Sequence, residues 1–236
     1  MKTRLMTCRL SAFFSLLVFA VFVSACGGSG SEVAQTESAQ PTSTDKATGV
    51  QYVVTPGTSV VMWEGYKPGR THTGTVDIGS GELYVDNGQI TGGLFSIDLT
   101  TITVTDLEAG KGKERLEAHL KGTTPGKEND FFNVNAFPAG SFEITRVTRL
   151  EGDEEANHMV YGNLKLKGIS KNIGFRAQID TQDNLVIVTT PMFSIDRTEW
   201  ELNFRSGKFF DNLGDNLIRD DIGLIINLVA AAQPEG

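Results

Sequence analysis

The sequence has few of the residues that build disulfide frameworks, metal sites and nucleic-acid interfaces. It contains two cysteines and three histidines in 236 residues. Lys and Arg number 21 against 29 Asp and Glu, so the formal net charge is -8 at pH 7. Because such a chain repels a phosphate backbone, we expect no nucleic-acid partner. The length and the 39% of apolar residues are typical of one folded domain with appendages.

Signatures of catalysis and of metal binding are also missing. The sequence has no G-x-S-x-G, H-E-x-x-H or G-x-x-x-x-G-K motif. Its histidines, His72, His119 and His158, lack the short spacing of zinc ligands. The acidic run at 209–221 departs from the EF-hand pattern, because Leu213 occupies a ligand position. We therefore expect no metal, no required cofactor and no enzyme activity.

The first 25 residues are typical of an export signal. Three basic residues precede an apolar run at 13–23, which is too short to span a bilayer comfortably. The Val-Ser-Ala sequence before Cys26 resembles a bacterial lipobox, whose cysteine receives a diacylglycerol before cleavage. The sequence therefore predicts a lipoprotein signal peptide at 1–25 and lipidation of Cys26. An ordinary signal peptide with a chance cysteine, or a weak hydrophobic anchor, is the alternative.

Residues 26–49 are expected to comprise the lipidated cysteine and a flexible linker. They are rich in Gly, Ser, Thr, Ala and Gln, and they lack aromatic residues and any hydrophobic period. Such a composition does not offset the entropy of ordering the chain. Since Cys8 would leave with the signal peptide, one cysteine would remain and no internal disulfide is expected. The folded domain is then predicted at 50–236.

Short runs of alternating apolar and polar residues recur along 50–236. The clearest lie at 160–167, 173–179 and 222–228, and shorter ones lie at 95–99 and 142–144. Each run predicts a half-buried β-strand. A single helix is predicted from Lys113 to Lys121, where Leu116 and Leu120 share one face and Gly122 follows. One helix cannot cover two sheet faces, so the strands must form a sandwich or a closed barrel.

A series of segments distinguishes these alternatives by resemblance. They are, in chain order, Trp63-Glu64-Gly65, His72-Thr73-Gly74-Thr75-Val76, Gly92-Gly93-Leu94-Phe95-Ser96-Ile97-Asp98, Leu116 to Lys121, Asn129-Asp130-Phe131-Phe132-Asn133-Val134 with Phe137-Pro138, Tyr161-Gly162-Asn163-Leu164 with Lys167-Gly168, and Arg197-Thr198-Glu199-Trp200. In their residues and in their order along the chain, these segments resemble the YceI-like polyisoprenoid-binding family over about residues 50–230. The resemblance implies an all-β fold, an extended eight-stranded antiparallel lipocalin-like β-barrel with one short α-helix.

The same resemblance implies a ligand and a location. The barrel interior of such a protein holds the apolar chain of an isoprenoid quinone, a polyprenol or another long-chain amphiphile. Together with the export signal, it implies a protein of the bacterial cell envelope. We expect a lipid anchor in the outer membrane, with the domain facing the periplasm, because Gly27 is compatible with outer-membrane sorting. A homodimer is left open.

The expected ligand contacts follow from the alternation within the predicted strands. The inward-facing set is Phe95, Ile97, Phe142, Ile144, Leu164, Leu166, Phe175, Ile179, Ile187, Leu224 and Ile226. Phe131 and Phe132 are expected at the barrel rim, and Trp200 with Arg197 beside the head group of the ligand. Core packing is the alternative for the apolar residues, and an ion pair is the alternative for Arg197.

The function predicted from these features is a lipid-anchored carrier or reservoir that buries an amphiphile reversibly. A prenyl chain offers no polar groups to recognise, so such a site needs length and apolar walls. Two other classes remain open. One is an interaction or scaffold module whose barrel is filled by its own side chains. The other is a hydrolase or isomerase of a bound lipid, for which His72 and Asp98 are the first residues to examine.

Overall fold

The structure is a computed structural model that describes residues 32–42, 44, 47–182 and 184–233. The described residues all belong to one compact unit, Ser31–Gly236. The expected signal peptide, Cys26 and residues 27–31 lie outside them.

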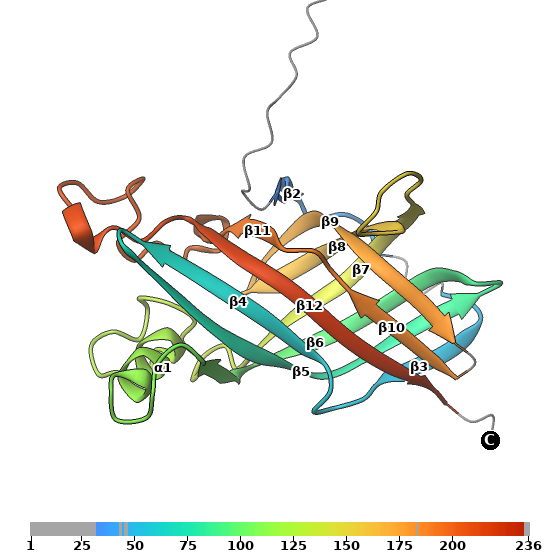
Figure 1. The fold of residues 1–236 in the computed structure, drawn as a ribbon, viewed down its shortest axis with the longest axis horizontal. Helices are drawn as coiled ribbons and strands as arrows, with labels where there is room; N and C mark the ends of the chain where they lie inside the picture. Colours follow the sequence, from blue (N-terminus) through green and yellow to red (C-terminus); the bar gives the residue numbers. More distant parts are fainter. Residues whose placement is uncertain (1–31, 43, 45–46, 183, 234–236) are drawn as a thin grey trace, which may run out of the picture. The chain divides into compact units, whose positions relative to one another are not determined.

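The described part of the chain is dominated by one twelve-stranded sheet (Figure 1). Its elements are β1 (Glu32–Val33), β2 (Thr36–Ser38), β3 (Val50–Val54), β4 (Val60–Lys67), β5 (Arg70–Asp86), β6 (Gln89–Val104), α1 (Lys113–Lys121), β7 (Ala139–Arg149), β8 (His158–Leu166), β9 (Ile169–Gln182), β10 (Leu185–Thr189), β11 (Phe193–Asp196), the 3-10 turns η2 (Arg197–Trp200) and η3 (Gly214–Asn216), and β12 (Asp221–Ala232).

The sheet closes on itself through β12. This strand pairs with β10 and β11 along one edge and with β3 and β4 along the other. Strands β10 and β11 lie end to end along β12 and together act as one barrel strand, and β3 and β4 do the same on the other side. With β5, β6, β7, β8, β9 and β12, the barrel therefore has eight strand positions. The all-β barrel is confirmed, with twelve strands instead of eight because two positions are interrupted and β1 and β2 are added.

Polar side chains bridge both interruptions. Pro191 separates β10 from β11, and a proline likewise precedes β4. Proline has no N–H and cannot donate to a strand ladder. On the β10 side, the Thr190 hydroxyl accepts a hydrogen bond of 2.9 Å from the N–H of Ile226. On the β4 side, the Ser59 hydroxyl accepts one of 3.0 Å from the N–H of Val229. Strand β12 thus keeps hydrogen-bond partners across both breaks.

Glycines lie under aromatic rings on the barrel wall, which explains part of their abundance. Gly81 and Phe95 face one another across β5 and β6, and a Cβ on Gly81 would lie 2.6 Å from the Phe95 ring. A Cβ on Gly162 would lie 2.2 Å from Cζ of Phe142 on the neighbouring strand. The rings therefore lie close to the sheet, over a backbone that carries no side chain.

The position of the helix agrees with the sequence prediction. α1 spans Lys113–Lys121 as expected, and Leu120 packs against the core. Gly122 has a φ of 71°, and its N–H closes the helix on the carbonyls of Ala118 and His119. No helix in the described residues is long and apolar enough to cross a bilayer.

Residues 32–38 do not form the expected flexible linker. β1 pairs in parallel with β11, and β2 pairs antiparallel with β9. Ala34, between them, is only 8% exposed, and its N–H donates to the Ser194 carbonyl at 2.7 Å. The prediction is wrong here because strand pairing uses backbone groups, which leave no side-chain pattern in the sequence. We call residues 32–41 the N-terminal strap.

Candidate ligand-binding site

Most of the expected ligand contacts lie together inside the barrel. The buried members of the apolar core include Phe95, Phe142, Ile144, Leu164, Leu166, Phe175, Ile179 and Trp200. Half-buried residues packed against this core include Ile97, Phe132, Leu224 and Ile226. The alternation in the sequence therefore identified one continuous apolar surface, whose side chains contact one another.

Ile187 is placed on the wrong face by the prediction. Strand β10 pairs Val186 with Ala230 and Val188 with Leu228, and all four side chains belong to the core or pack on it. Since side chains alternate along a strand, Ile187 lies on the opposite, outer face. The run 185–189 is apolar at every position but the last, so its pattern does not distinguish the two faces.

Phe131 lies in an aromatic cluster beside α1. Its ring centroid is 5.1 Å from His119 and 5.5 Å from Phe204, and His119 and Phe204 are 4.9 Å apart. His119 also shares a hydrogen bond of 2.7 Å between Nε2 and Oδ2 of Asp130. Phe131 is buried by these contacts. This cluster packs α1 and the segment after it against Phe204, in the loop that follows η2.

Trp200 and Arg197 are buried in the short turn η2. Trp200 is 0% exposed, and its indole N–H donates to the Leu164 carbonyl at 3.1 Å. Arg197 is 1% exposed and donates to the carbonyls of Arg219, Ile218 and Leu202. Its carboxylate partner is Asp220, at 3.4 Å, and burial lowers the pKa of the guanidinium. Both side chains are therefore fully engaged within the protein.

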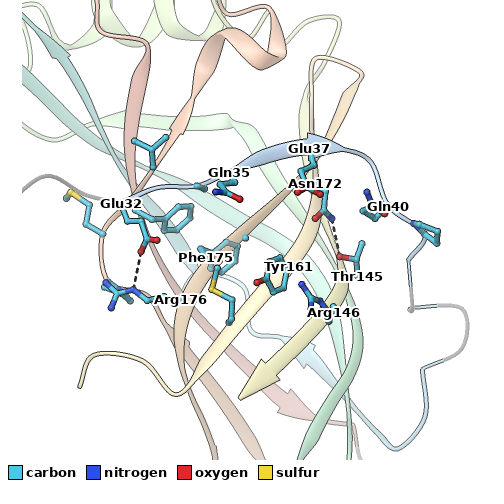
Figure 2. A pocket seen from close by; sticks show the side chains of 18 residues that line it. Glu32, Gln35, Glu37, Gln40, Thr145, Arg146, Tyr161, Asn172, Phe175 and Arg176 are labelled. Carbon is cyan, nitrogen blue, oxygen red and sulfur yellow. Dashed lines mark hydrogen bonds and ion pairs between the residues drawn. The ribbon is translucent and has the colours of Figure 1, made fainter. Parts of the chain in front are cut away.

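The larger cavity lies at the barrel wall, beneath the N-terminal strap. It has a volume of about 690 Å³. Its lining residues are Glu32, Val33, Ala34, Gln35, Glu37, Gln40, Pro41, Thr145, Arg146, Met159, Tyr161, Asn172, Gly174, Phe175, Arg176, Pro191, Met192 and Phe193. Figure 2 shows polar side chains of the strap and of β7–β9 around this space. Among the predicted ligand contacts, Phe175 lines it.

The interruption at Pro191 explains why the cavity lies there. Strand β9 pairs with β10 only from Gln178 to Gln182, and β11 continues along β12 instead. The strap occupies the resulting space, with β1 beside β11 and β2 beside β9. Phe175 of β9 and Phe193 of β11 stack beneath it, with ring centroids 4.8 Å apart. These two buried rings separate the cavity from the rest of the core.

Charges on the cavity wall are largely paired. Arg176 lies 2.8 Å from Asp153, 3.4 Å from Glu155 and 3.6 Å from Glu32 of the strap. The hydrogen bond between Arg176 and Asp153 raises the pKa of the guanidinium and lowers the pKa of the carboxyl. Arg146 differs, because its guanidinium lies 4.0 Å above the Tyr161 ring.

A second cavity of about 450 Å³ lies near the aromatic cluster beside α1. Its lining residues are Asn129, Asp130, Phe137, Lys167, Glu201, Asn203, Phe204 and Phe210. Burial lowers the pKa of Lys167, whose ammonium donates to the Glu201 carbonyl at 3.2 Å. The Oδ1 atom of Asn203 is buried without a hydrogen-bond partner. This cavity is more polar in character than the barrel interior.

The residues considered for catalysis have separate partners. His72 Nδ1 lies 2.8 Å from Asp106 Oδ2, at one end of β5. Asp98 lies opposite Asp77, further along β5, and accepts hydrogen bonds from the N–H and hydroxyl of Thr100. The described residues contain no group of three or more His, Cys, Asp or Glu side chains placed to hold a metal ion.

The strap is the part of this site that sequence reasoning missed. Its residues were assigned to the linker because they lack an apolar period. A usable signal is the pair Glu32-Val33 followed by Thr36, which are acceptable strand residues in an otherwise small and polar segment. That signal is too short to predict a strand without knowledge of the free edges of β9 and β11.

Comparison with known proteins agrees with this architecture. The sequence model of the YceI-like domain family matches residues 52–230. The BcnA structure of Burkholderia cenocepacia is similar with a TM-score of 0.54 at 16% identity, covering 73% of this chain and 96% of that protein. A polyisoprenoid-binding domain from Saccharophagus degradans gives a TM-score of 0.56 at 13% identity, covering 78% and 99%. None of the curated proteins matches this chain.

Proposed function

This chain belongs to the YceI-like domain family, and from that premise we propose that it binds a polyisoprenoid or a similar long-chain amphiphile as a carrier or reservoir, without catalysis. The observation that supports this proposal best is the continuous apolar inner face of the closed barrel. The similar structure from Saccharophagus degradans, described as a polyisoprenoid-binding domain, agrees with it.

The apolar inner face supplies the kind of attraction that such a ligand needs. Each methylene removed from water contributes about 0.8 kcal/mol. About ten buried isoprenoid carbons therefore contribute roughly 5 to 8 kcal/mol before ordering costs, which approaches micromolar affinity. The row of rings formed by Phe142, Phe175 and Phe193, with successive centroids 5.4 and 4.8 Å apart, is the path that we assign to the chain.

We further propose that the protein is exported and held at the bacterial outer membrane by a lipid on Cys26, facing the periplasm. The apolar run at 13–23 and the lipobox-like sequence support this proposal. With the strap docked, only residues 27–31 separate Cys26 from β1. Six residue steps span at most about 22 Å, so the lipid would keep the barrel near the membrane in which the ligand dissolves.

The test is native mass spectrometry of the protein purified from its own envelope, before and after organic extraction. We expect a reproducible bound mass that extraction removes. Ile179→Trp places an indole inside the barrel and should reduce the bound lipid several-fold, because the added ring takes the space of the chain. Ile187→Trp, on the outer face of the adjacent strand, is the matched control. Protein that is always empty contradicts the proposal.

A scaffold module with a filled barrel is the second candidate, and the dense contacts within the core favour it. It predicts an empty protein in mass spectrometry and equal behaviour of the two Trp variants apart from stability. A partner protein would then recognise an exposed apolar patch. The same experiment therefore separates the two functions.

A further inference from the structure

The N-terminal strap closes a gap in the barrel wall with few contacts. Its strands β1 and β2 contain two and three residues. Beyond them, Gln40 and Asn163 exchange two hydrogen bonds, from Gln40 N to Oδ1 at 2.9 Å and from Nδ2 to Gln40 O at 2.7 Å. Val33 is 55% exposed. Segments with so little buried apolar surface open at a lower free energy than the barrel that they cover.

The cavity beneath the strap meets the apolar core at one place. Phe175 and Phe193 line the cavity and also belong to the core cluster. Met159, on the outer face of β8, and Met192 lie beside these rings, and methionine side chains adapt readily to a flexible guest. Because the two rings separate the cavity from the rest of the core, a hydrocarbon chain passes from here to the path assigned to it inside the barrel only where the rings part.

The polar residues of the cavity indicate an uncharged head group. Two carboxylates, Glu32 and Glu37, and two guanidinium groups, Arg146 and Arg176, line the space, and two further carboxylates lie against Arg176, so the surroundings carry a net negative formal charge. Arg176 is held by three carboxylates. Arg146 is stacked on Tyr161, and no carboxylate of the described residues forms an ion pair with it, so its N–H groups can donate to an oxygen acceptor. A hydroxyl or a quinone carbonyl fits this environment, whereas a phosphate would meet the two carboxylates.

We infer that the cavity beneath the N-terminal strap is a lateral binding site for the head group and first carbons of a prenyl alcohol or prenyl quinone, and that the strap is its removable cover. This inference rests on the proposed function, because it names the head-group chemistry and the route to the same barrel interior. The ligand enters sideways between β9 and β11, and the strap re-forms its strand pairs over it.

A disulfide across the strap tests the cover. Ser38 and Lys171 face one another in the antiparallel pair of β2 and β9. Opposite residues in such pairs lie within the range that a disulfide bridges. The full-length chain with Ser38→Cys and Lys171→Cys is oxidised and mixed with phosphatidylcholine vesicles that contain tritiated geranylgeraniol. We expect transfer of the label to be at least tenfold slower than after reduction, because the strap cannot lift.

The matched control carries Met62→Cys and Thr75→Cys, which face one another in the antiparallel pair of β4 and β5, two strands that contribute no residue to the cavity lining. Its transfer rate should not depend on oxidation. Equal transfer rates for the oxidised and reduced strap variant would refute the role of the strap as a removable cover. If both forms still bound the labelled lipid, the proposed function would be unaffected. Absence of binding by every form, including the unaltered chain, would instead refute the proposed function.

Photolabelling tests the location of the head group independently of any disulfide. A geranylgeraniol analogue with a diazirine next to its oxygen is bound to the unaltered protein, irradiated and mapped by peptide mass spectrometry. We expect labels on peptides that contain Met159, Tyr161 or Met192, and competition by geranylgeraniol at lower concentration than by its monophosphate. Labels confined to inner residues such as Phe95 and Leu164 would overturn the lateral site but not lipid binding.

Discussion

At the scale of single residues, polar groups fix one end of the barrel around η2. Asp196 caps this turn, since its Oδ1 accepts from the N–H and the hydroxyl of Thr198 at 2.9 and 2.6 Å. This turn positions Arg197, which donates hydrogen bonds to three backbone carbonyls. It also positions Trp200, which is part of the buried core. A buried guanidinium that lost this placement would leave those carbonyls without partners. The loss of the Asp196 cap would therefore also disturb the placement of Arg197 and Trp200.

Removal of this cap should destabilise the protein in a pH-dependent manner. Burial alone raises the pKa of Asp196, but hydrogen bonds from Lys208 and Thr198 outweigh burial and lower the pKa. A carboxyl with a lowered folded pKa stabilises the protein above its unfolded pKa of about 3.9, and the stabilisation is lost as pH falls through the folded pKa. We expect Asp196→Ala to lower the free energy of unfolding by about 1 kcal/mol at pH 7.

Urea unfolding at pH 7 and near pH 3 measures this difference. The gap between the unaltered protein and Asp196→Ala should narrow at the lower pH, because this carboxyl binds a proton more readily in the unfolded chain than in the folded protein, which favours unfolding of the unaltered protein. Asp196→Asn is the matched variant, since its amide oxygen can still cap the turn without the charge that faces Lys208. A gap that stays constant or widens in acid would contradict the assigned role of the carboxylate.

At the scale of elements, contacts between glycine and aromatic side chains join neighbouring strands. Phe142 of β7 lies over Gly162 of β8, where a Cβ would be 2.2 Å from its ring. We therefore expect Gly162→Ala to destabilise the protein by about 1 to 3 kcal/mol through overpacking. Chemical denaturation of Gly162→Ala, Phe142→Leu and the double variant measures the coupling. The double variant should lose less than the sum of the two single losses, because the smaller side chain relieves the clash.

Gly65→Ala in β4 is the control for this prediction. Nothing lies within 4 Å of a Cβ built at Gly65, and its backbone does not require a positive φ. This change should leave the stability unaltered or raise it slightly, because alanine restricts the unfolded chain more than glycine does. If the losses of stability in Gly162→Ala and Phe142→Leu simply add in the double variant, the Phe142 ring does not require a glycine at position 162.

The elements that the sequence predicted best are those with local signals. α1 begins and ends as expected because its helix formers and Gly122 are contiguous in sequence. The faces of β8 and β9 follow from strict alternation, as at Leu164 and Phe175. Ile187 was oriented wrongly, because its neighbours are apolar on both faces and only pairing with β12 selects the inner face.

The candidate site was less predictable than the fold, because it depends on contacts between distant segments. Barrel closure itself required the family resemblance, since alternation is equally compatible with a sandwich. The strap pairs with edges of β9 and β11 that are more than a hundred residues away in sequence. Its burial at Ala34 has no local signature. A cavity formed by such a segment cannot be read from residue patterns alone.

At the scale of the whole molecule, the net charge of the chain bears on the proposed attachment to a membrane by a covalent lipid. The net charge of -8 becomes -11 when the expected signal peptide is removed, since its charged residues are Lys2, Arg4 and Arg9. Anionic lipid head groups repel such a protein. Attachment by acyl chains is stable only when there is more than one of them, as the proposed lipidated cysteine would provide.

The two cysteines of the precursor allow a matched test of this attachment. Cells that express the chain are labelled with tritiated palmitate, and the protein is recovered and its radioactivity measured. We expect Cys8→Ala to incorporate label as the unaltered chain does, because Cys8 lies within the expected signal peptide. Cys26→Ala should lose the label completely and also leave the outer-membrane fraction. Label that persists in Cys26→Ala, or that disappears in Cys8→Ala, would show that the lipobox-like sequence is not the modified site. Because the strap begins six residues after Cys26, a lipid at that position would hold the start of the strap, which lines the lateral cavity, within about 22 Å of the lipidated residue.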